Sequence, residues 1–297
     1  MPDAAPTLVE PATAFPLKRT APGDRFFDYC LQPYRPRRPS DGKLRAENLL
    51  WKTLELGGVL DAARPVIEAL QGALGRDMVV WGAKYDGERL FWELYVYDPR
   101  KEEPRATVSG LSEILSPHLR LPAVRESIPY MMVSFDLDAQ ILASGEVPEL
   151  NLYLTGTDEH AGRSYIVRRD GAELANTYRF LSPKLDIDTI LGLLRSSVFI
   201  DYSAPRTLGA VLRPELYACK RVCVAKKRLR DGVYFSGIDV DQLLGFFTRF
   251  AYPPALIELT TALAGQLDHL FFDVGLDMEQ DASGAIRYPK TSFYGTF

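Results

Sequence analysis

Asp-Gly dipeptides set between alternating apolar and polar segments constrain the fold of this chain more than any other feature. Asp-Gly is the strongest short signal for a β-hairpin, because glycine adopts the positive φ of the tight turn without steric cost. Three such dipeptides predict three hairpins, at Asp86-Gly87 between strands 78–85 and 89–97, at Asp170-Gly171 between 163–169 and 174–181, and at Asp231-Gly232 between 220–228 and 233–238. The chain is therefore expected to be rich in antiparallel sheet.

Two further strand pairs bring the expected total to ten strands. They are 130–138 with 149–155 and 270–279 with 285–295. Helical spacing of apolar residues precedes most pairs, at 44–56, 59–74, 107–119, 187–198, 207–217 and 239–250, with one more helix ending near 268. Hairpin 163–181 lacks such helices, so whether it belongs to the same sheet stays open. Repetition of one helix-then-hairpin unit predicts an α/β (α+β) fold.

Within the strands, alternation separates an apolar face from a polar face. In strand 130–138 the apolar face carries Met131, Val133, Phe135 and Leu137. The opposite face carries Met132, Ser134, Asp136 and Asp138. Because amphipathic helices need an apolar surface to cover, the apolar strand face should lie beneath them.

The polar strand face is rich in tyrosine. Its expected tyrosines are Tyr95, Tyr97, Tyr153, Tyr234 and Tyr294. A solvated sheet face usually carries Lys, Glu and Thr, whereas the inner wall of a closed barrel can be half-polar. The pattern favours an antiparallel barrel of about ten strands, with helices outside and a central cavity. An open sheet with one wet face is the alternative.

Eight prolines fall within the first 40 residues, at positions 2, 6, 11, 16, 22, 33, 36 and 39. Such spacing interrupts helices and strands, and predicts an extended arm over residues 1–42. Residues 43–297 are expected to form a single domain, since 46% of the chain is hydrophobic and can bury a substantial core.

Composition argues against several classes of function. A formal net charge of −4 offers no general basic surface, so no nucleic-acid partner is expected. Without a long apolar run or a signal-peptide pattern, and with three cysteines, the protein is expected to be cytoplasmic, with no membrane partner. Because no GxGxxG after a strand, GxxxxGKS/T, HExxH or GxSxG motif is present, no nucleotide or redox cofactor is expected.

The order of helices and hairpins resembles the ABBA aromatic prenyltransferases, whose ten strands close into a PT-barrel with a solvent-filled centre. VSFDLD at 133–138 followed by ELNLYLTG at 149–156 is similar to the family's strand pair with Asn-x-Tyr on the lumen face. CKRVCVAKKRL at 219–229 and IRYPKTSFYG at 286–295 resemble two later strands. The resemblance covers about 44–297 and implies transfer of an allylic isoprenoid from its diphosphate to an aromatic acceptor.

Several polar side chains then become candidates for diphosphate binding. The resemblance implies this role for Lys290, Tyr294, Asn151 and Tyr153. Arg221 and Lys227 share one face of strand 220–228 and are further candidates, while Lys226 lies on the other face, and the sequence does not show which face points inward. Strand 149–155 offers no cation, unlike the family pattern. Shielding of the allylic cation and the acceptor pocket are expected from Tyr95, Tyr97, Tyr234 and Ser292.

Carboxylates supply the candidate catalytic groups. Glu93 interrupts an apolar-aromatic strand, where it could orient an acceptor hydroxyl or indole N–H or take up the released proton. Pairing of Glu93 with a nearby Lys or Arg as a structural feature is the alternative. Asp136 is the second catalytic candidate, and with Asp138 on the same face it forms the candidate Mg²⁺ pair. Asp273 and Asp277 form a less compact second pair.

Two hypotheses from different classes follow. The first is a prenyltransferase that uses a prenyl diphosphate donor, such as dimethylallyl diphosphate, and an aromatic small molecule or peptide acceptor, in a dissociative electrophilic alkylation. The second is a barrel that binds a small molecule without chemistry, or serves as a biosynthetic accessory protein. Clustering of Lys290 and Asn151 with a cation of strand 220–228 at one end of the cavity would favour the enzyme, and a lumen filled with bulky side chains would favour the second hypothesis.

Overall fold

A closed barrel of ten antiparallel strands dominates the computed structural model, which describes residues 12–156, 158 and 160–297. Around the barrel the strands follow the order β1-β10-β9-β8-β7-β6-β5-β4-β3-β2. They are β1 Val79–Tyr85, β2 Leu90–Tyr97, β3 Met132–Leu137, β4 Leu150–Thr155, β5 Ala161–Arg168, β6 Gly171–Leu181, β7 Arg221–Lys227, β8 Asp231–Ile238, β9 Phe272–Gln280 and β10 Ile286–Thr296. The predicted barrel class is confirmed.

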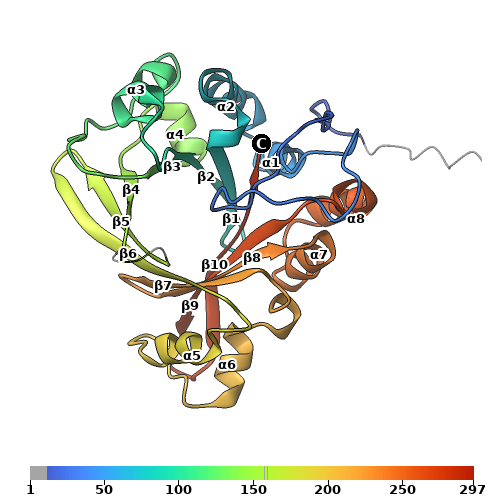
Figure 1. Cartoon of the computed structure of the whole chain (residues 1–297), viewed down its shortest axis with the longest axis vertical. Helices are drawn as coiled ribbons and strands as arrows, with labels where there is room; N and C mark the ends of the chain where they lie inside the picture. The colour runs from blue at the N-terminus through green and yellow to red at the C-terminus, as the bar shows by residue number, and fades with distance from the viewer. Residues whose placement is uncertain (1–11, 157, 159) are drawn as a thin grey trace, which may run out of the picture.

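Helices lie outside the ring of strands (Figure 1). The α-helices of the described residues are α1 Glu47–Leu56, α2 Leu60–Leu74, α3 Val108–Leu115, α4 Ala139–Ser144, α5 Ile187–Arg195, α6 Pro205–Val211, α7 Val240–Arg249 and α8 Pro254–Leu267. Short 3₁₀ turns cover Arg76–Met78, Pro104–Ala106 and Pro214–Leu216. Within the described part of the chain, every helix is too short or too polar to cross a bilayer. Helix α4 was not predicted, because six residues are too few to show helical periodicity.

Hairpin β5–β6 is a full part of the barrel wall, which answers the question left open by the sequence. β5 pairs with β4 from Leu150↔Val167 to Thr155↔Gly162, and β6 pairs with β7 from Asn176↔Lys227 to Leu181↔Val222. The register of β5 and β6 shifts next to Ser164, where β6 has a bulge. Beyond a bulge the face assignment of a strand changes, so simple alternation fails there.

The third predicted turn was placed wrongly. Asp231 and Gly232 begin β8, and the chain reverses at residues 228–230 instead. Asp231 is buried and forms an ion pair with Lys226 at 3.2 Å, while Gly232 leaves room for the side chain of Lys227 beside it. Close packing inside the barrel, rather than turn geometry, therefore explains this glycine. At the first hairpin, Gly87 has the expected positive φ of 97°.

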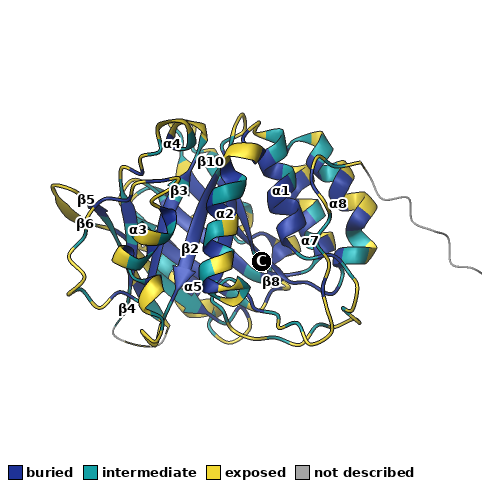
Figure 2. Ribbon diagram, turned by 90° about the horizontal axis from the view of Figure 1, so that it is seen from above, coloured by how far each residue is buried: buried dark blue, intermediate teal, exposed yellow. Residues whose placement is uncertain are grey.

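The main hydrophobic core lies between the barrel and its helices. Outward-facing residues of the strands, among them Trp81, Trp92 and Phe293, are almost completely buried there. The Trp92 indole N–H donates to Thr53 Oγ1 of α1 at 2.8 Å, which joins helix and strand. Figure 2 shows buried residues on the strands and the inner helix faces, and exposed residues on the periphery. The apolar strand face thus lies beneath the helices, as predicted.

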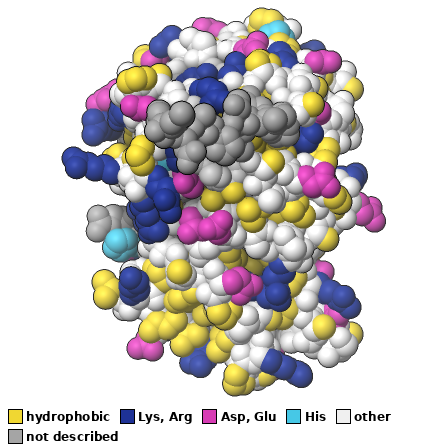
Figure 3. Space-filling view, turned by 90° about the vertical axis from the view of Figure 1, so that its right-hand side faces the viewer, with side chains coloured by type: hydrophobic (Ala, Val, Ile, Leu, Met, Phe, Trp, Pro, Cys, Tyr) yellow, Lys and Arg dark blue, Asp and Glu magenta, His cyan; other side chains and the backbone are white. Residues whose placement is uncertain are grey.

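Residues 12–42 contain isolated bridges and no helix or extended strand. They lie against α1 and the end of α8, where Lys18 N donates to Asn48 Oδ1 and Arg38 Nε lies 3.3 Å from Asp268 Oδ2. Residues 26–34, named the strap here, fold back on themselves through the hydrogen bond from Tyr34 N to the Phe26 carbonyl. On the face shown in Figure 3, basic and acidic side chains are interspersed.

Candidate active site

The barrel encloses a cavity of about 1620 Å³. Its wall includes most of the strand residues predicted to face inward, together with residues of the strap and of loops at the ends of the barrel. A pocket for one drug-sized ligand usually measures about 300–1,000 Å³. The lumen is therefore large enough for two substrates at once, and it is not filled by bulky side chains.

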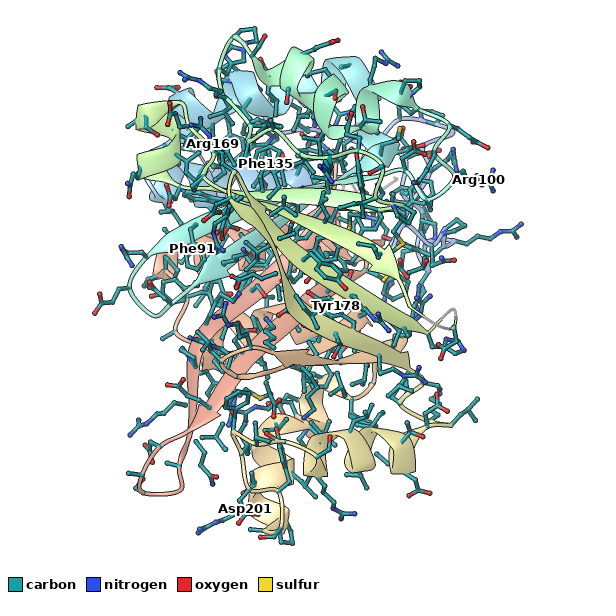
Figure 4. The ribbon with its side chains drawn as sticks, turned by 90° about the vertical axis from the view of Figure 1, so that its left-hand side faces the viewer. Phe91, Arg100, Phe135, Arg169, Tyr178 and Asp201 are labelled. Carbon is teal, nitrogen blue, oxygen red and sulfur yellow. The ribbon has the colours of Figure 1, made fainter. Side chains whose placement is uncertain are left out.

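A continuous series of aromatic rings, the tyrosine belt, crosses the middle of this cavity. It consists of Tyr178, Tyr153, Tyr95, Tyr294 and Tyr234, whose successive ring centroids lie 6.1, 6.3, 6.1 and 6.2 Å apart. Figure 4 looks onto the side of the barrel that carries Tyr178. The belt forms a nearly unbroken aromatic wall.

Two glycines make the close approach of these rings possible. A Cβ atom at Gly82 would lie 2.6 Å from the ring of Tyr294, and one at Gly275 would lie 2.6 Å from the ring of Tyr234. Burial raises the pKa of each belt tyrosine above that of a free phenol, so the rings are neutral at physiological pH. Neutral phenol faces attract a cation through the ring quadrupole.

Three lysines meet on one side of the tyrosine belt, at what is called the lysine end. Lys227 Nζ lies 2.5 Å from Asp277 Oδ1, and Lys290 Nζ lies 3.1 Å from the other oxygen, Oδ2. The third lysine, Lys84, contacts Asp136 Oδ1 at 2.5 Å and Glu93 Oε2 at 2.7 Å. All three belong to different strands, and all line the same cavity.

Burial and neighbouring charges shift the pKa values of the groups at the lysine end. The pKa of Lys227 falls to about 8, chiefly because burial disfavours its charged form. Asp277 opposes this shift, and the positive charges of Lys290 and Lys84 add to it. Burial would raise the pKa of Asp277, yet Lys227 and Lys290 lower it to about 2. An anion bound among the lysines would relieve their mutual repulsion.

Glu93 lies between the lysine end and the tyrosine belt. Its Oε2 accepts a hydrogen bond from the Tyr95 hydroxyl at 2.5 Å, and its Oε1 accepts one from the Ser134 hydroxyl. Burial acts to raise the pKa of Glu93, but Lys84 and these hydroxyls lower it overall, so the carboxylate is ionised. The predicted alternative of a paired carboxylate is thus realised, at a position that also faces the cavity.

Most predicted site residues do line the cavity. They are Glu93, Asp136, Lys290, Asn151, Tyr153, Lys227, Tyr294, Tyr95, Tyr97, Tyr234 and Arg221. Ser292 is an exception, because it is buried behind the wall and donates a hydrogen bond to the Tyr294 hydroxyl at 2.9 Å. Its role in lining an acceptor pocket was predicted wrongly, since it supports a tyrosine that does so.

Arg221 faces the lumen but lies at its opposite end. Six positions separate it from Lys227 on β7, or about 20 Å along an extended strand. There its guanidinium is 3.8 Å from Asp28 of the strap. A diphosphate site shared by Arg221, Lys227 and Lys290 is therefore not formed, because strand alternation fixes the face of a residue and not its height in the barrel.

The expected Mg²⁺ pair is not assembled either. Asp138 follows β3 and accepts a hydrogen bond from Ile141 N, which caps α4, whereas Asp136 is paired with Lys84. Among the described residues, no cluster of three His, Cys, Asp or Glu side chains could hold a metal ion. These residues do not fit a magnesium ion held by the protein.

Lys84, Tyr178 and Tyr29 are among the contributors to the cavity that sequence reasoning missed. Lys84 was detectable, because the hairpin at Asp86-Gly87 places it diagonally across from Glu93. Tyr178 follows the β6 bulge, where alternation gives no reliable face. Tyr29 comes from the proline-rich arm, which has no periodicity to interpret. The centroid of its ring lies 4.6 Å from the ring centroid of Tyr294 and 5.4 Å from that of Tyr95.

Comparison with known proteins supports the fold. Neither a family model nor a curated protein matches the chain. Among solved structures, AnaPT from Neosartorya fischeri matches with a TM-score of 0.52 and 8% sequence identity, over 84% of this chain and 92% of that chain. At such low identity the likeness concerns the fold alone. AnaPT is an ABBA prenyltransferase, and this chain therefore has the PT-barrel fold that its sequence resemblance implied.

Proposed function

We propose that this protein is an aromatic prenyltransferase, which moves an allylic isoprenoid such as dimethylallyl from its diphosphate to an aromatic acceptor. One observation carries the proposal: a cluster of lysines borders a sleeve of tyrosine rings inside one cavity. Lys227 Nζ lies 5.3 Å from the ring centroid of Tyr234, and Glu93 links Lys84 to Tyr95. Dissociative transfer needs two adjacent sites: one that binds the leaving diphosphate anion and one that shields the allylic cation from water.

The reaction follows from this arrangement. Lys84, Lys227 and Lys290 hold the diphosphate, so that the bond between the allylic carbon and its oxygen breaks and the electron pair leaves with the diphosphate. The allylic cation then faces the tyrosine belt, which stabilises it and excludes water. An electron-rich carbon or heteroatom of the acceptor forms the new bond, and the proton it loses passes to the Glu93 carboxylate.

Noncatalytic binding is the competing function, and it would use the same cavity. Thermal unfolding with dimethylallyl, geranyl and inorganic diphosphate tests the donor site first. A ligand at 100 times its Kd adds about 2.7 kcal/mol of stability, or roughly 4 °C in Tm for a chain of this size. Failure of all three to raise Tm would contradict the proposal.

Incubation with dimethylallyl diphosphate and a panel of indoles, phenols and naphthols then tests the chemistry. Mass spectrometry should detect prenylated acceptor and released diphosphate in equal amounts. Donor binding without any such product across the panel would favour the noncatalytic barrel.

A further inference from the structure

The end of the cavity opposite the lysines holds a carboxylate that lacks a full set of partners. Asp273 of β9 is only 3% exposed. Its Oδ2 accepts a hydrogen bond from Tyr29 N of the strap at 3.1 Å, whereas its Oδ1 makes no well-formed hydrogen bond with the described residues, although the Ser236 hydroxyl and the Gly237 N–H lie close enough to lower the pKa of the carboxyl group. The hydroxyl of Ser236, the cross-strand neighbour of Asp273, is unpartnered in the same way, and both residues line the cavity.

Arg221 and Lys220, two cations at this end of the cavity, contact groups other than Asp273. The carboxylate of Asp28 already accepts hydrogen bonds from Cys30 N and Gln32 N and faces Arg221 at 3.8 Å. Lys220 Nζ lies over the ring of Phe271, 3.8 Å from its centroid. Burial and the negative charge of Asp28 raise the pKa of Asp273 to about 7. A buried carboxylate in this setting gains from any ligand that brings a positive N–H donor.

The two ends of the lumen therefore present different groups to a ligand. Asp277 lies at the lysine end, and Asp273 precedes it by four residues on the same strand, which corresponds to about 13 Å. The tyrosine belt lines the wall between them, since Tyr234 and Tyr294 flank β9 on either side. A ligand that reaches from the belt to Asp273 needs an aromatic ring and a short polar side chain.

We propose that Asp273 and Ser236 form a head-group site for an aromatic acceptor that carries a protonated amine on a side chain of two or three atoms. The acceptor ring lies in the tyrosine belt, beside the allylic carbon of a donor held by the lysines. The ammonium group donates hydrogen bonds to Asp273 Oδ1 and Ser236 Oγ, which supplies the partners that both atoms lack. Assignment of this ligand as acceptor rests on the proposed function, whereas the amine site itself does not.

Binding of matched ligands to the full chain, at pH 8 and without donor, tests the site. The pairs are tryptamine with 3-ethylindole, and tyramine with 4-ethylphenol, which differ in the amine. Each amine should bind the unmodified protein at least about tenfold more tightly than its neutral partner, as expected for hydrogen bonds to a charged group. Asp273→Asn keeps an acceptor for Tyr29 N, so it should abolish this preference and leave the affinity of the ethyl compounds unchanged.

Ser236→Ala is the second variant, and it should reduce the preference for the amine without affecting the neutral compounds. Equal affinity of the unmodified protein for both members of each pair would overturn the proposal, as would equal weakening of both by Asp273→Asn. If Asp273→Asn does not fold, the affinities of the unmodified protein and of Ser236→Ala for the amine and neutral ligands still test the site. If the protein prefers the amines but neither binds a prenyl diphosphate nor transfers a prenyl group, the proposed function is wrong and the amine site is still supported.

Discussion

Lys290 has the most accessible ammonium of the three lysines, with 23% of its side chain exposed against 12% for Lys227 and 7% for Lys84. We expect Lys290→Ala to weaken binding of dimethylallyl and inorganic diphosphate by about 10- to 100-fold, the range for loss of a hydrogen bond to a charged group. Tm without ligand should change little, since the partly exposed side chain of Lys290 does not pack in the hydrophobic core. Isothermal titration calorimetry measures the affinity.

The matched control is Lys52→Ala, which removes an ion pair with Glu55 on α1, outside the cavity. It should leave diphosphate affinity unchanged. If Lys290→Ala leaves the Kd for dimethylallyl and inorganic diphosphate unchanged, Lys290 does not bind the donor, whatever the activity of the variant.

Lys84 has a structural role in addition to its proposed one. Replacement by Met would leave the buried Glu93 without its cation, and such a loss typically costs about 3–5 kcal/mol. We therefore expect a lower free energy of unfolding for Lys84→Met in urea denaturation. The double variant Lys84→Met with Glu93→Gln should recover part of the loss, because the uncompensated charge is gone. No recovery would show that the pair is not electrostatically coupled.

At the scale of elements, period-two alternation predicted all ten strands to within a few residues, because most strands have one face under helices and the other towards the lumen. The same rule misplaced Arg221 and Ser292 in the site. Alternation carries no information on height along the barrel axis, or on whether a larger neighbour such as Tyr294 covers a small side chain. The bulge in β6 and the six-residue α4 are likewise invisible to periodicity.

The strap contributes an element-level prediction. Tyr29 packs against Tyr294, Tyr95 and Tyr97 and so narrows the lumen beyond the belt. In Tyr29→Ala the longer tail of geranyl diphosphate should enter the volume that the ring vacates. Burial of one or two additional methylenes should raise the affinity of the protein for geranyl diphosphate, relative to dimethylallyl diphosphate, by about tenfold. Calorimetric Kd values for both donors give this ratio.

Tyr29→Phe is the matched control, because it keeps the ring and the backbone N–H bonded to Asp273. The ratio of its Kd values for geranyl and dimethylallyl diphosphate should equal that of the unmodified protein. Identical ratios in Tyr29→Ala and Tyr29→Phe would show that the strap does not limit the depth of the donor site.

At the scale of the whole molecule, the lysine end exists only because the barrel closes. Lys84 and Lys290 come from β1 and β10, which pair through Lys84↔Ser292, while Lys227 belongs to β7 on the other side of β8 and β9. No local sequence pattern places these three cations together. Their juxtaposition follows from strand order, and strand order could be inferred only from the family resemblance.

This assembly makes donor binding sensitive to pH above neutrality. Lys227 has a pKa of about 8 in the folded protein, so its ammonium is charged below pH 8 and loses its proton above it. The Kd for dimethylallyl diphosphate should thus be constant near pH 7 and rise by about tenfold by pH 9.5, as one charge-assisted hydrogen bond is lost. In Lys227→Arg the guanidinium stays charged, so its Kd should remain flat over this range. A flat profile for the unmodified protein would mean that Lys227 does not contact the donor, because the terminal phosphate of the ligand is already ionised above about pH 7.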